Sequence, residues 1–160
     1  MHAEKLDQID LEILKILQQN GRTKRNELAE CVKLTNPAIS ERLRKLEEHG
    51  VIKKYTTIVD AEKVQLGVTA FIFVMVESST YFPQVIINAE KHGEILECHA
   101  ITGGGSHLLK VRTQSTTSLE KLLSQIQAWK GVKNTMTNVV LSSPKETTAL
   151  PLDHLLESLK

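Results

Sequence analysis

The side chains in this sequence that are best suited to recognition chemistry are basic, and they cluster between residues 20 and 57. This stretch holds nine Lys or Arg residues and five acidic ones, whereas the whole chain of 160 residues has a net charge of only +1. A local excess of positive charge is compatible with contact to nucleic-acid phosphates. It is also compatible with an ordinary mixed-charge helical surface that faces water.

The segment after Thr35 adds side chains that can recognise the edges of bases. Asn and Arg, found here as Asn36, Arg42 and Arg44, suit bidentate hydrogen bonds to adenine and guanine. The full set of candidate DNA-contacting residues is Lys24, Asn36, Pro37, Ala38, Ser40, Glu41, Arg42, Arg44, Lys45, Lys53 and Lys54.

The sequence lacks the common catalytic and metal-binding motifs. Cys98 and His99 are adjacent on a predicted strand and point to opposite faces, and adding His107 does not complete a zinc site. There is no HExxH motif and no nucleophile elbow. We therefore predict no catalytic residue, no metal and no cofactor.

Three helices are predicted to position the basic residues. Apolar residues from Leu6 to Leu17 recur at three- and four-residue steps, which is typical of one buried helical face. A second helix is predicted over residues 24–32. The third follows Thr35, a favourable N-cap, and accepts Pro37 in its first turn. Its predicted buried face is Ile39, Leu43 and Leu46.

The tight turn between the second and third helices predicts a helix-turn-helix, in which the third helix enters a DNA major groove. A generic packing unit of three helices is the alternative. Residues 51–59 are β-prone and predict a hairpin, the wing of a winged helix-turn-helix. Lys53 and Lys54 would then contact the DNA backbone beside the groove.

The second half of the chain predicts a different architecture. Strands are expected at residues 70–76, 95–101, 108–113 and 132–141, with helices at 81–92 and 118–129. This strand-helix-strand-strand-helix-strand order predicts a ferredoxin-like βαββαβ domain, so the fold class is α+β. Residues 70–76 are apolar on both faces, and both helices pack on the same face of the sheet. The bare face predicts oligomerisation.

Length and composition are those of an ordinary globular protein. The content is 41% hydrophobic and 24% charged, and no apolar run is long enough to span a membrane. Two cysteines without a CxxC motif fit a reducing cytoplasm. The expected domains are residues 1–60 (winged helix-turn-helix), 61–67 (linker), 68–143 (ferredoxin-like) and 144–160 (C-terminal extension with a short helix).

An ordered set of motifs resembles the Lrp/AsnC (feast-famine) transcriptional regulators over nearly the whole chain. The motifs are Leu6-Asp7-x-x-Asp10-x-x-Ile13-Leu14, Asn20-Gly21-Arg22, Glu27-Leu28-Ala29, Leu34-Thr35, Arg42-Leu43-Arg44-Lys45-Leu46-Glu47, Gly50-Val51-Ile52-Lys53-x-Tyr55 and Val132-x-x-Thr135-x-Thr137. The resemblance implies a cytoplasmic, sequence-preferring regulator that binds double-stranded DNA. It also implies homodimers that assemble further and often respond to an amino acid.

Two positions depart from the pattern of that family. The usual Ser or Thr cap of the second helix is replaced by Lys24. The family's turn after the second strand carries acidic residues that help to fix the amino group of a bound amino acid, whereas this turn has none. The candidate effector-binding residues are Thr102, Gly103, Gly104, Gly105 and Ser106. We expect common amino acids to bind weakly there, and the segment is interpreted either as a simple turn or as a site for a carboxylate or neutral effector.

Two other functional classes stay open at this stage. Proteins similar to this family act as decarboxylases of sirohaem-type tetrapyrroles, and a stand-alone small-molecule sensor is also conceivable. The basic face of the third helix argues against both, because neither class needs it. We therefore predict a DNA-binding regulator and not an enzyme.

Overall fold

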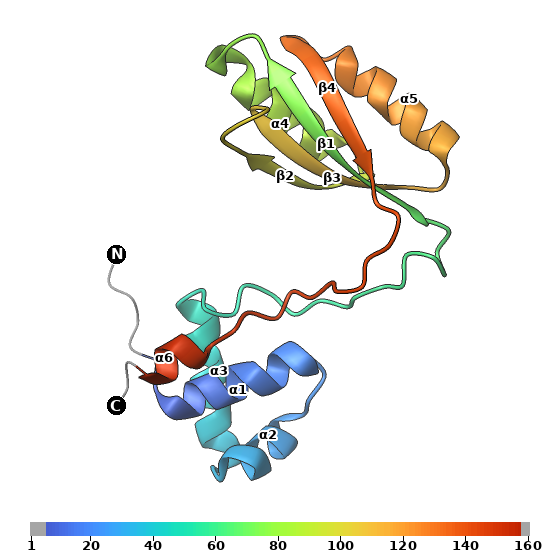
Figure 1. Cartoon of the computed structure of the whole chain (residues 1–160). Coiled ribbons are helices and arrows are strands. Elements are labelled where there is room, and N and C mark those ends of the chain that lie inside the picture. Colours follow the sequence, from blue (N-terminus) through green and yellow to red (C-terminus); the bar gives the residue numbers. More distant parts are fainter. Residues whose placement is uncertain (1–5, 158–160) are drawn as a thin grey trace. The chain divides into compact units, whose positions relative to one another are not determined.

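The computed structural model describes residues 6–157, which form two compact units (Figure 1). The first unit contains the chain up to Ile58 together with the residues from Lys145 onward. The second contains Val59–Pro144. The C-terminal segment therefore belongs to the same unit as the first helices.

The first unit is built on α1 (Gln8–Gln19), α2 (Arg25–Val32) and α3 (Asn36–Glu48). Asp7 caps α1, because its carboxylate accepts from the Asp10 amide at 2.8 Å while Asp10 accepts from the Asp7 amide at 3.1 Å. The three helices share one apolar core, formed by Ile13, Leu14, Leu28, Ala29, Val32, Ile39, Leu43 and Leu46. The predicted three-helix arrangement is confirmed.

The predicted β-hairpin wing is wrong, because residues 51–67 contain no strand. The segment from Val51 to Val59 contains no Gly, Asn, Asp or Pro that could close a tight hairpin, and an isolated two-stranded hairpin is marginally stable. Val51 and Ile52 pack against the helical core, whereas Ile58 and Val59 are exposed, with Ile58 at 79%. Lys53 and Lys54 lie on an extended segment that follows α3.

The C-terminal segment packs onto α1. The side-chain amide of Gln18 accepts from the Leu150 backbone amide at 2.6 Å and donates to the Leu150 carbonyl at 3.2 Å. Lys15 pairs with Asp153 at 2.6 Å, at the start of the short helix α6 (Asp153–Glu157), and Leu152 packs against the helical core. Figure 1 shows α6 beside α1. The predicted helix 153–159 extends beyond the described residues.

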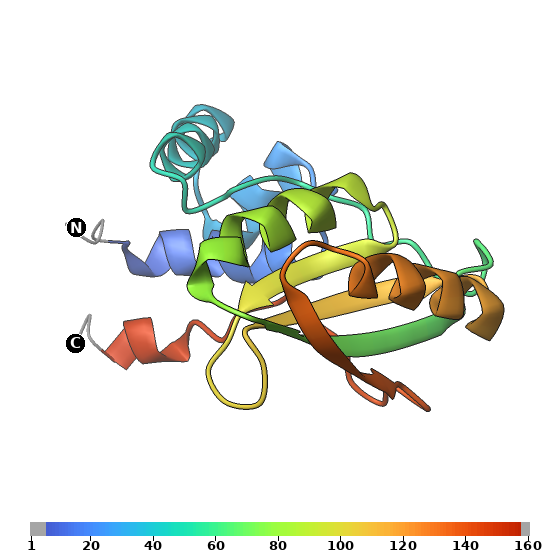
Figure 2. The same cartoon turned by 90° about the horizontal axis from the view of Figure 1, so that it is seen from above.

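The second unit has the predicted ferredoxin-like order. Its elements are β1 (Val68–Val76), a 3₁₀ turn (Ser79–Tyr81), α4 (Phe82–Lys91), β2 (Ile95–Ala100), β3 (His107–Thr113), α5 (Thr116–Gln127) and β4 (Val132–Val139). The four antiparallel strands lie in the order β2-β3-β1-β4. Both helices cover the same face of this sheet (Figure 2).

Side-chain alternation along β1 divides the sheet into a covered face and a bare face. Ile72, Val74 and Leu109 of the sheet are buried in one core with Leu122 and Ile126 of α5. Phe71, Phe73 and Met75 therefore point to the opposite face, where Phe73 is in register with Leu108 on β3 and with Met136 on β4. Met136 is 50% exposed. The expected bare apolar face is present in this unit.

Candidate nucleic-acid interface

The turn before α3 sets the direction of this helix. Lys33 adopts a left-handed conformation at φ 55°, and the Leu34 amide closes the end of α2 by donating to the Ala29 carbonyl at 2.9 Å. The Thr35 hydroxyl then caps α3 by accepting from the Ala38 amide. With Ile39, Leu43 and Leu46 buried, the opposite face of α3 points to solvent.

The predicted DNA-contacting residues fall into two groups around this face. On α3, Asn36, Pro37, Glu41, Arg44 and Lys45 are exposed, whereas Ala38, Ser40 and Arg42 are half-buried. Away from α3, Lys24 lies just before α2, and Lys53 and Lys54 follow α3, all of them exposed. The structure therefore brings most of the predicted set to the surface of one unit.

Arg42 makes contacts within the fold. Its guanidinium lies 2.6 Å from an Asp10 carboxylate oxygen and 2.8 Å from an Asp7 oxygen, so it ties α3 to the start of α1. Burial alone would lower the pKa of Arg42, but hydrogen bonds to Asp10 and Asp7 outweigh it and raise that pKa. Sequence reasoning missed this role, although both aspartates are part of the capping motif of α1.

Arg44 is bound by two glutamates of its own helix. Its Nε and Nη2 donate to the two Glu41 carboxylate oxygens at 2.9 and 2.7 Å, and its Nη1 donates to Glu48 at 2.6 Å. Lys45 lies 3.7 Å from the same Glu41 carboxylate. The hydrogen bond from Arg44 lowers the pKa of Glu41, and the bonds to both glutamates raise the pKa of Arg44.

The start of α2 has only part of a capping box. Glu27 accepts from the Lys24 backbone amide at 3.2 Å, and the Lys24 side chain makes no capping hydrogen bond. Thr23, one residue out of step, donates instead to the Asn20 carbonyl at 2.8 Å. The Lys24 ammonium is therefore left exposed beside the helix-turn-helix.

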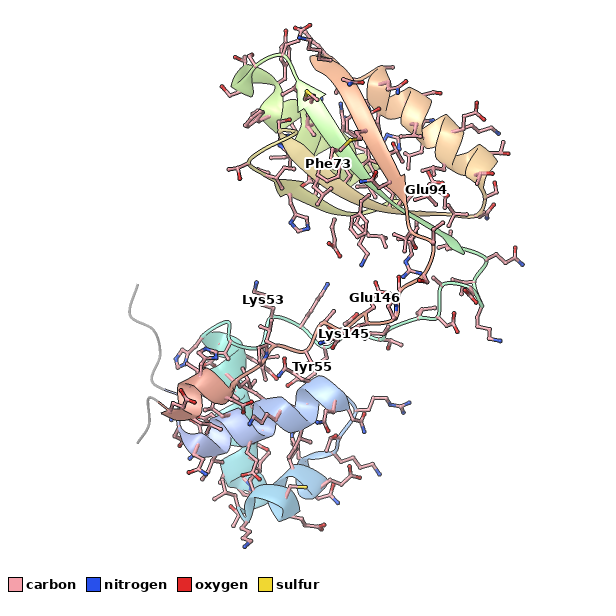
Figure 3. The ribbon with its side chains drawn as sticks, viewed as in Figure 1. Lys53, Tyr55, Phe73, Glu94, Lys145 and Glu146 are labelled. Atoms are coloured by element: carbon pink, nitrogen blue, oxygen red, sulfur yellow. The ribbon has the colours of Figure 1, made fainter. Side chains whose placement is uncertain are left out.

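Tyr55 ties the segment after α3 to that helix. Its hydroxyl donates to Glu47 at 2.9 Å, and burial together with this bond raises the pKa of Tyr55 to about 12. Figure 3 labels Tyr55 and Lys53 on this segment. Sequence reasoning missed the contact, because it placed Tyr55 in a hairpin; the only signal was a tyrosine eight residues after a glutamate.

The candidate effector turn, Thr102–Ser106, directs its serine inward. Both the Ser106 hydroxyl and the Ser106 amide donate to the Val74 carbonyl at 2.9 Å. Gly103 has a positive φ of 102°, and a Cβ at Gly105 would lie 3.2 Å from the same Val74 oxygen. The geometry of a tight turn therefore accounts for Gly103 and Gly105.

His107, which sequence reasoning assessed only as a metal ligand, is buried next to this turn. Its Nδ1 lies 3.0 Å from the Ser106 hydroxyl, whose hydrogen is given to Val74, so Nδ1 is the donor. The Phe82 ring packs edge-on against it at 4.8 Å. Burial lowers the pKa of His107, which favours a neutral imidazole.

Two further properties concern the described residues alone. Within residues 6–157, no group of three or more His, Cys, Asp or Glu side chains could hold a metal ion. No helix in that same part of the chain is long and apolar enough to cross a membrane.

Comparison with known proteins gives matches to both units. A model of winged helix-turn-helix DNA-binding domains matches residues 6–53, and a model of the Lrp/AsnC ligand-binding domain matches residues 69–150. HTH-type transcriptional regulator FL11 from Pyrococcus horikoshii is 41% identical, covering 92% of this chain and 97% of its own length. The leucine-responsive regulatory protein of Escherichia coli is 32% identical, covering 91% and 90%.

Solved structures match over nearly the whole chain as well. The transcriptional regulator NMB0573 from Neisseria meningitidis, in complex with L-Met, has a TM-score of 0.90 and 34% sequence identity. The match covers 94% of this chain and 99% of that one. Escherichia coli AsnC matches with a TM-score of 0.83 and 28% identity, over 89% and 97%.

Proposed function

Because this chain belongs to the Lrp/AsnC family of DNA-binding transcriptional regulators, we propose that it prefers particular DNA sequences and reads them with α3. The observation that carries this role is the outward face of α3, which holds Arg44 and Lys45, together with the exposed Asn36 in the first turn of the helix. A helix that buries one face against two others and presents Asn and Arg on the opposite face fits a major groove.

The other basic residues have different roles in this proposal. Lys24, Lys53 and Lys54 contact phosphates on either side of the groove, and Pro37, Ala38, Ser40 and Glu41 flank the contact surface. Arg42 acts indirectly, because Asp7 and Asp10 already hold its guanidinium. Its contribution is to keep α3 at a fixed angle to α1.

We assign a separate role to each of the predicted domains. Residues 1–60 bind DNA, residues 61–67 link the units, and residues 68–143 bind an effector and assemble subunits. Residues 144–160 form an extension whose described part supports the DNA-binding unit through Gln18 and Lys15. The proposed activity needs no catalytic residue or cofactor, and DNA as the partner places the protein in the cytoplasm.

Homodimers that assemble into larger oligomers complete the proposal. The bare sheet face offers Phe73, Leu108 and Met136 as an apolar surface, and a second copy of the same face is a suitable cover for it. For the effector, we propose a site near Thr102–Ser106 that binds common amino acids weakly. The L-Met found with a relative makes methionine the first ligand to test.

Selection of bound fragments from a random DNA pool tests the proposed function. The full chain should enrich a near-palindromic sequence, and Arg44→Ala should weaken binding to the selected fragment strongly. Lys53→Ala should instead lower affinity for all sequences and flatten the salt dependence. Failure to enrich any sequence, or unchanged affinity of a folded Arg44→Ala variant, would contradict the role given to α3.

A further inference from the structure

Helix α3 as a whole carries no net charge. Its basic residues Arg42, Arg44 and Lys45 are matched in number by Glu41, Glu47 and Glu48. Each of the three basic side chains lies within 4 Å of a carboxylate. A helix proposed to read DNA thus brings no net charge to a polyanion, which is unexpected for a surface whose task is to attract phosphates.

The flanking basic residues are arranged differently. Among the described residues, Arg22, Lys24, Lys33, Lys53 and Lys54 form no ion pair. General attraction to DNA can therefore come from these flanking side chains, which lie outside α3. Helix α3, which has no net charge, can then discriminate between sequences.

Arg44 binds two of the three glutamates of α3. All three of its guanidinium nitrogens donate to Glu41 or Glu48, in i,i+3 and i,i+4 pairs, although the side chain is 52% exposed. Exposed pairs of this kind are individually weak, so DNA can displace them. Displacing them leaves two carboxylates without their cation close to the phosphates.

We propose that Glu41 and Glu48 are specificity-determining residues, because they compete with DNA for the guanidinium of Arg44. This inference rests on the proposed role of α3 as the reading helix. A single phosphate is a poor replacement for the two carboxylates as a partner of Arg44, and it leaves their negative charge facing the DNA backbone. A guanine edge in the correct position offers two acceptors in the plane of the guanidinium and compensates the loss. The glutamates therefore disfavour the wrong sequence more than the right one.

The test uses the full chain with a fragment selected from a random pool and a scrambled fragment of equal length and composition. In the Glu41→Gln/Glu48→Gln variant we expect affinity for the scrambled fragment to rise about three- to tenfold and affinity for the selected fragment to change less than twofold. The specificity ratio falls accordingly. Glu30→Gln, which removes an exposed charge from α2, is the matched control and should leave the ratio unchanged.

The same two glutamates are then replaced in an Arg44→Ala background. If they act through Arg44, their replacement no longer changes the ratio, whereas plain repulsion between carboxylates and DNA would persist there. An unchanged ratio in the first variant, or an equal change with and without Arg44, overturns the inference. If Arg44→Ala alone leaves binding to the selected fragment unaffected, the reading role of α3 fails with it.

Discussion

The two arginines of α3 lie in different electrostatic environments although they are only two residues apart. Arg44 is half exposed among glutamates of its own helix, whereas Arg42 is 27% exposed and bridges to Asp10, which is 15% exposed. A charge-assisted hydrogen bond in a partly buried position stabilises more than an exposed one. Arg42 therefore contributes mainly to stability.

We expect Arg42→Ala to lower the free energy of unfolding by about 1–2 kcal/mol, since removing one partner leaves Asp10 poorly compensated. Lys45→Ala, three residues further along α3, should change it by less than about 0.5 kcal/mol. Urea unfolding followed by circular dichroism measures both. An Arg42→Ala variant as stable as the parent would show that the bridge to α1 is not stabilising.

Asp7 gives this bridge a dependence on pH. Burial raises the pKa of Asp7, but the hydrogen bonds from the Asp10 amide and Arg42 together lower it by more. The folded pKa therefore lies below the usual value. The stabilisation is then fully present above about pH 4 and is lost as the pH falls through the lower, folded pKa. We expect the stability difference between the parent and Asp7→Asn to shrink on acidification over that range. A difference that stays constant down to the acid transition would contradict this assignment.

At the scale of elements, Gly131 is a position in the second unit that has no room for a side chain. It precedes β4 with a φ of 85°, and a Cβ there would overlap the ring of Tyr81, which precedes α4. Only glycine allows the ring to lie against this backbone.

Gly131→Ala should therefore destabilise the fold by at least about 2 kcal/mol, through combined strain and overlap. Gly104→Ala is the control, because a Cβ at Gly104 would meet no atom within 4 Å and the backbone there is not in the positive-φ range. Thermal unfolding of the two variants measures the difference. Equal melting temperatures would show that Tyr81 moves aside at little cost.

Elements with strong periodicity could be predicted from the sequence, and contacts between distant residues could not. The buried faces of α1 and α3 and the alternation along β1 follow from local spacing. The prediction of a hairpin wing was wrong because β propensity alone does not supply a turn or a partner strand. The bond between Gln18 and Leu150 joins residues 132 positions apart, and no local pattern marks it.

In the candidate site, too, burial could be predicted from the sequence but side-chain partners could not. Spacing was sufficient to predict that Ile39, Leu43 and Leu46 are buried. Of the residues expected on the opposite face, Ala38, Ser40 and Arg42 are half-buried and the others are exposed. The partners of the charged residues were not predicted, because an arginine can turn to a carboxylate on its own helix or on a neighbour. Arg42 and Arg44 differ in this choice, and only the folded chain determines it.

At the scale of the whole molecule, the bare sheet face favours association. Phe73→Glu would place a charge between Leu108 and Met136, where a second copy is proposed to pack. We expect this variant to shift the assembly toward monomers. Lys133→Glu, at an exposed position of β4, is the control and should keep the size of the parent assembly. Light scattering at micromolar concentration measures both. A parent chain that is already monomeric would refute the proposed assembly.

The response to amino acids depends on what the ligand-binding unit offers to an ammonium group. No residue of the turn Thr102–Ser106 carries a carboxylate, and Ser106 is already bound to the Val74 carbonyl. Glu97 is the acidic residue of β2, but His99 at 3.1 Å and Lys110 at 3.4 Å already pair with it. An amino acid bound at the turn would therefore bury its ammonium without a free anionic partner.

We expect calorimetric titration with the twenty amino acids, methionine first, to show binding at least about tenfold weaker than micromolar, and DNA binding to proceed without any of them. The reason is the missing charge-assisted bond, which contributes roughly 1.5–3 kcal/mol where it is present. Gly104→Trp is the diagnostic variant, since a Cβ at Gly104 would meet no atom of its own chain within 4 Å. Micromolar binding that Gly104→Trp abolishes would refute the prediction. It would mean that the ammonium of the ligand displaces Lys110 or His99 from Glu97.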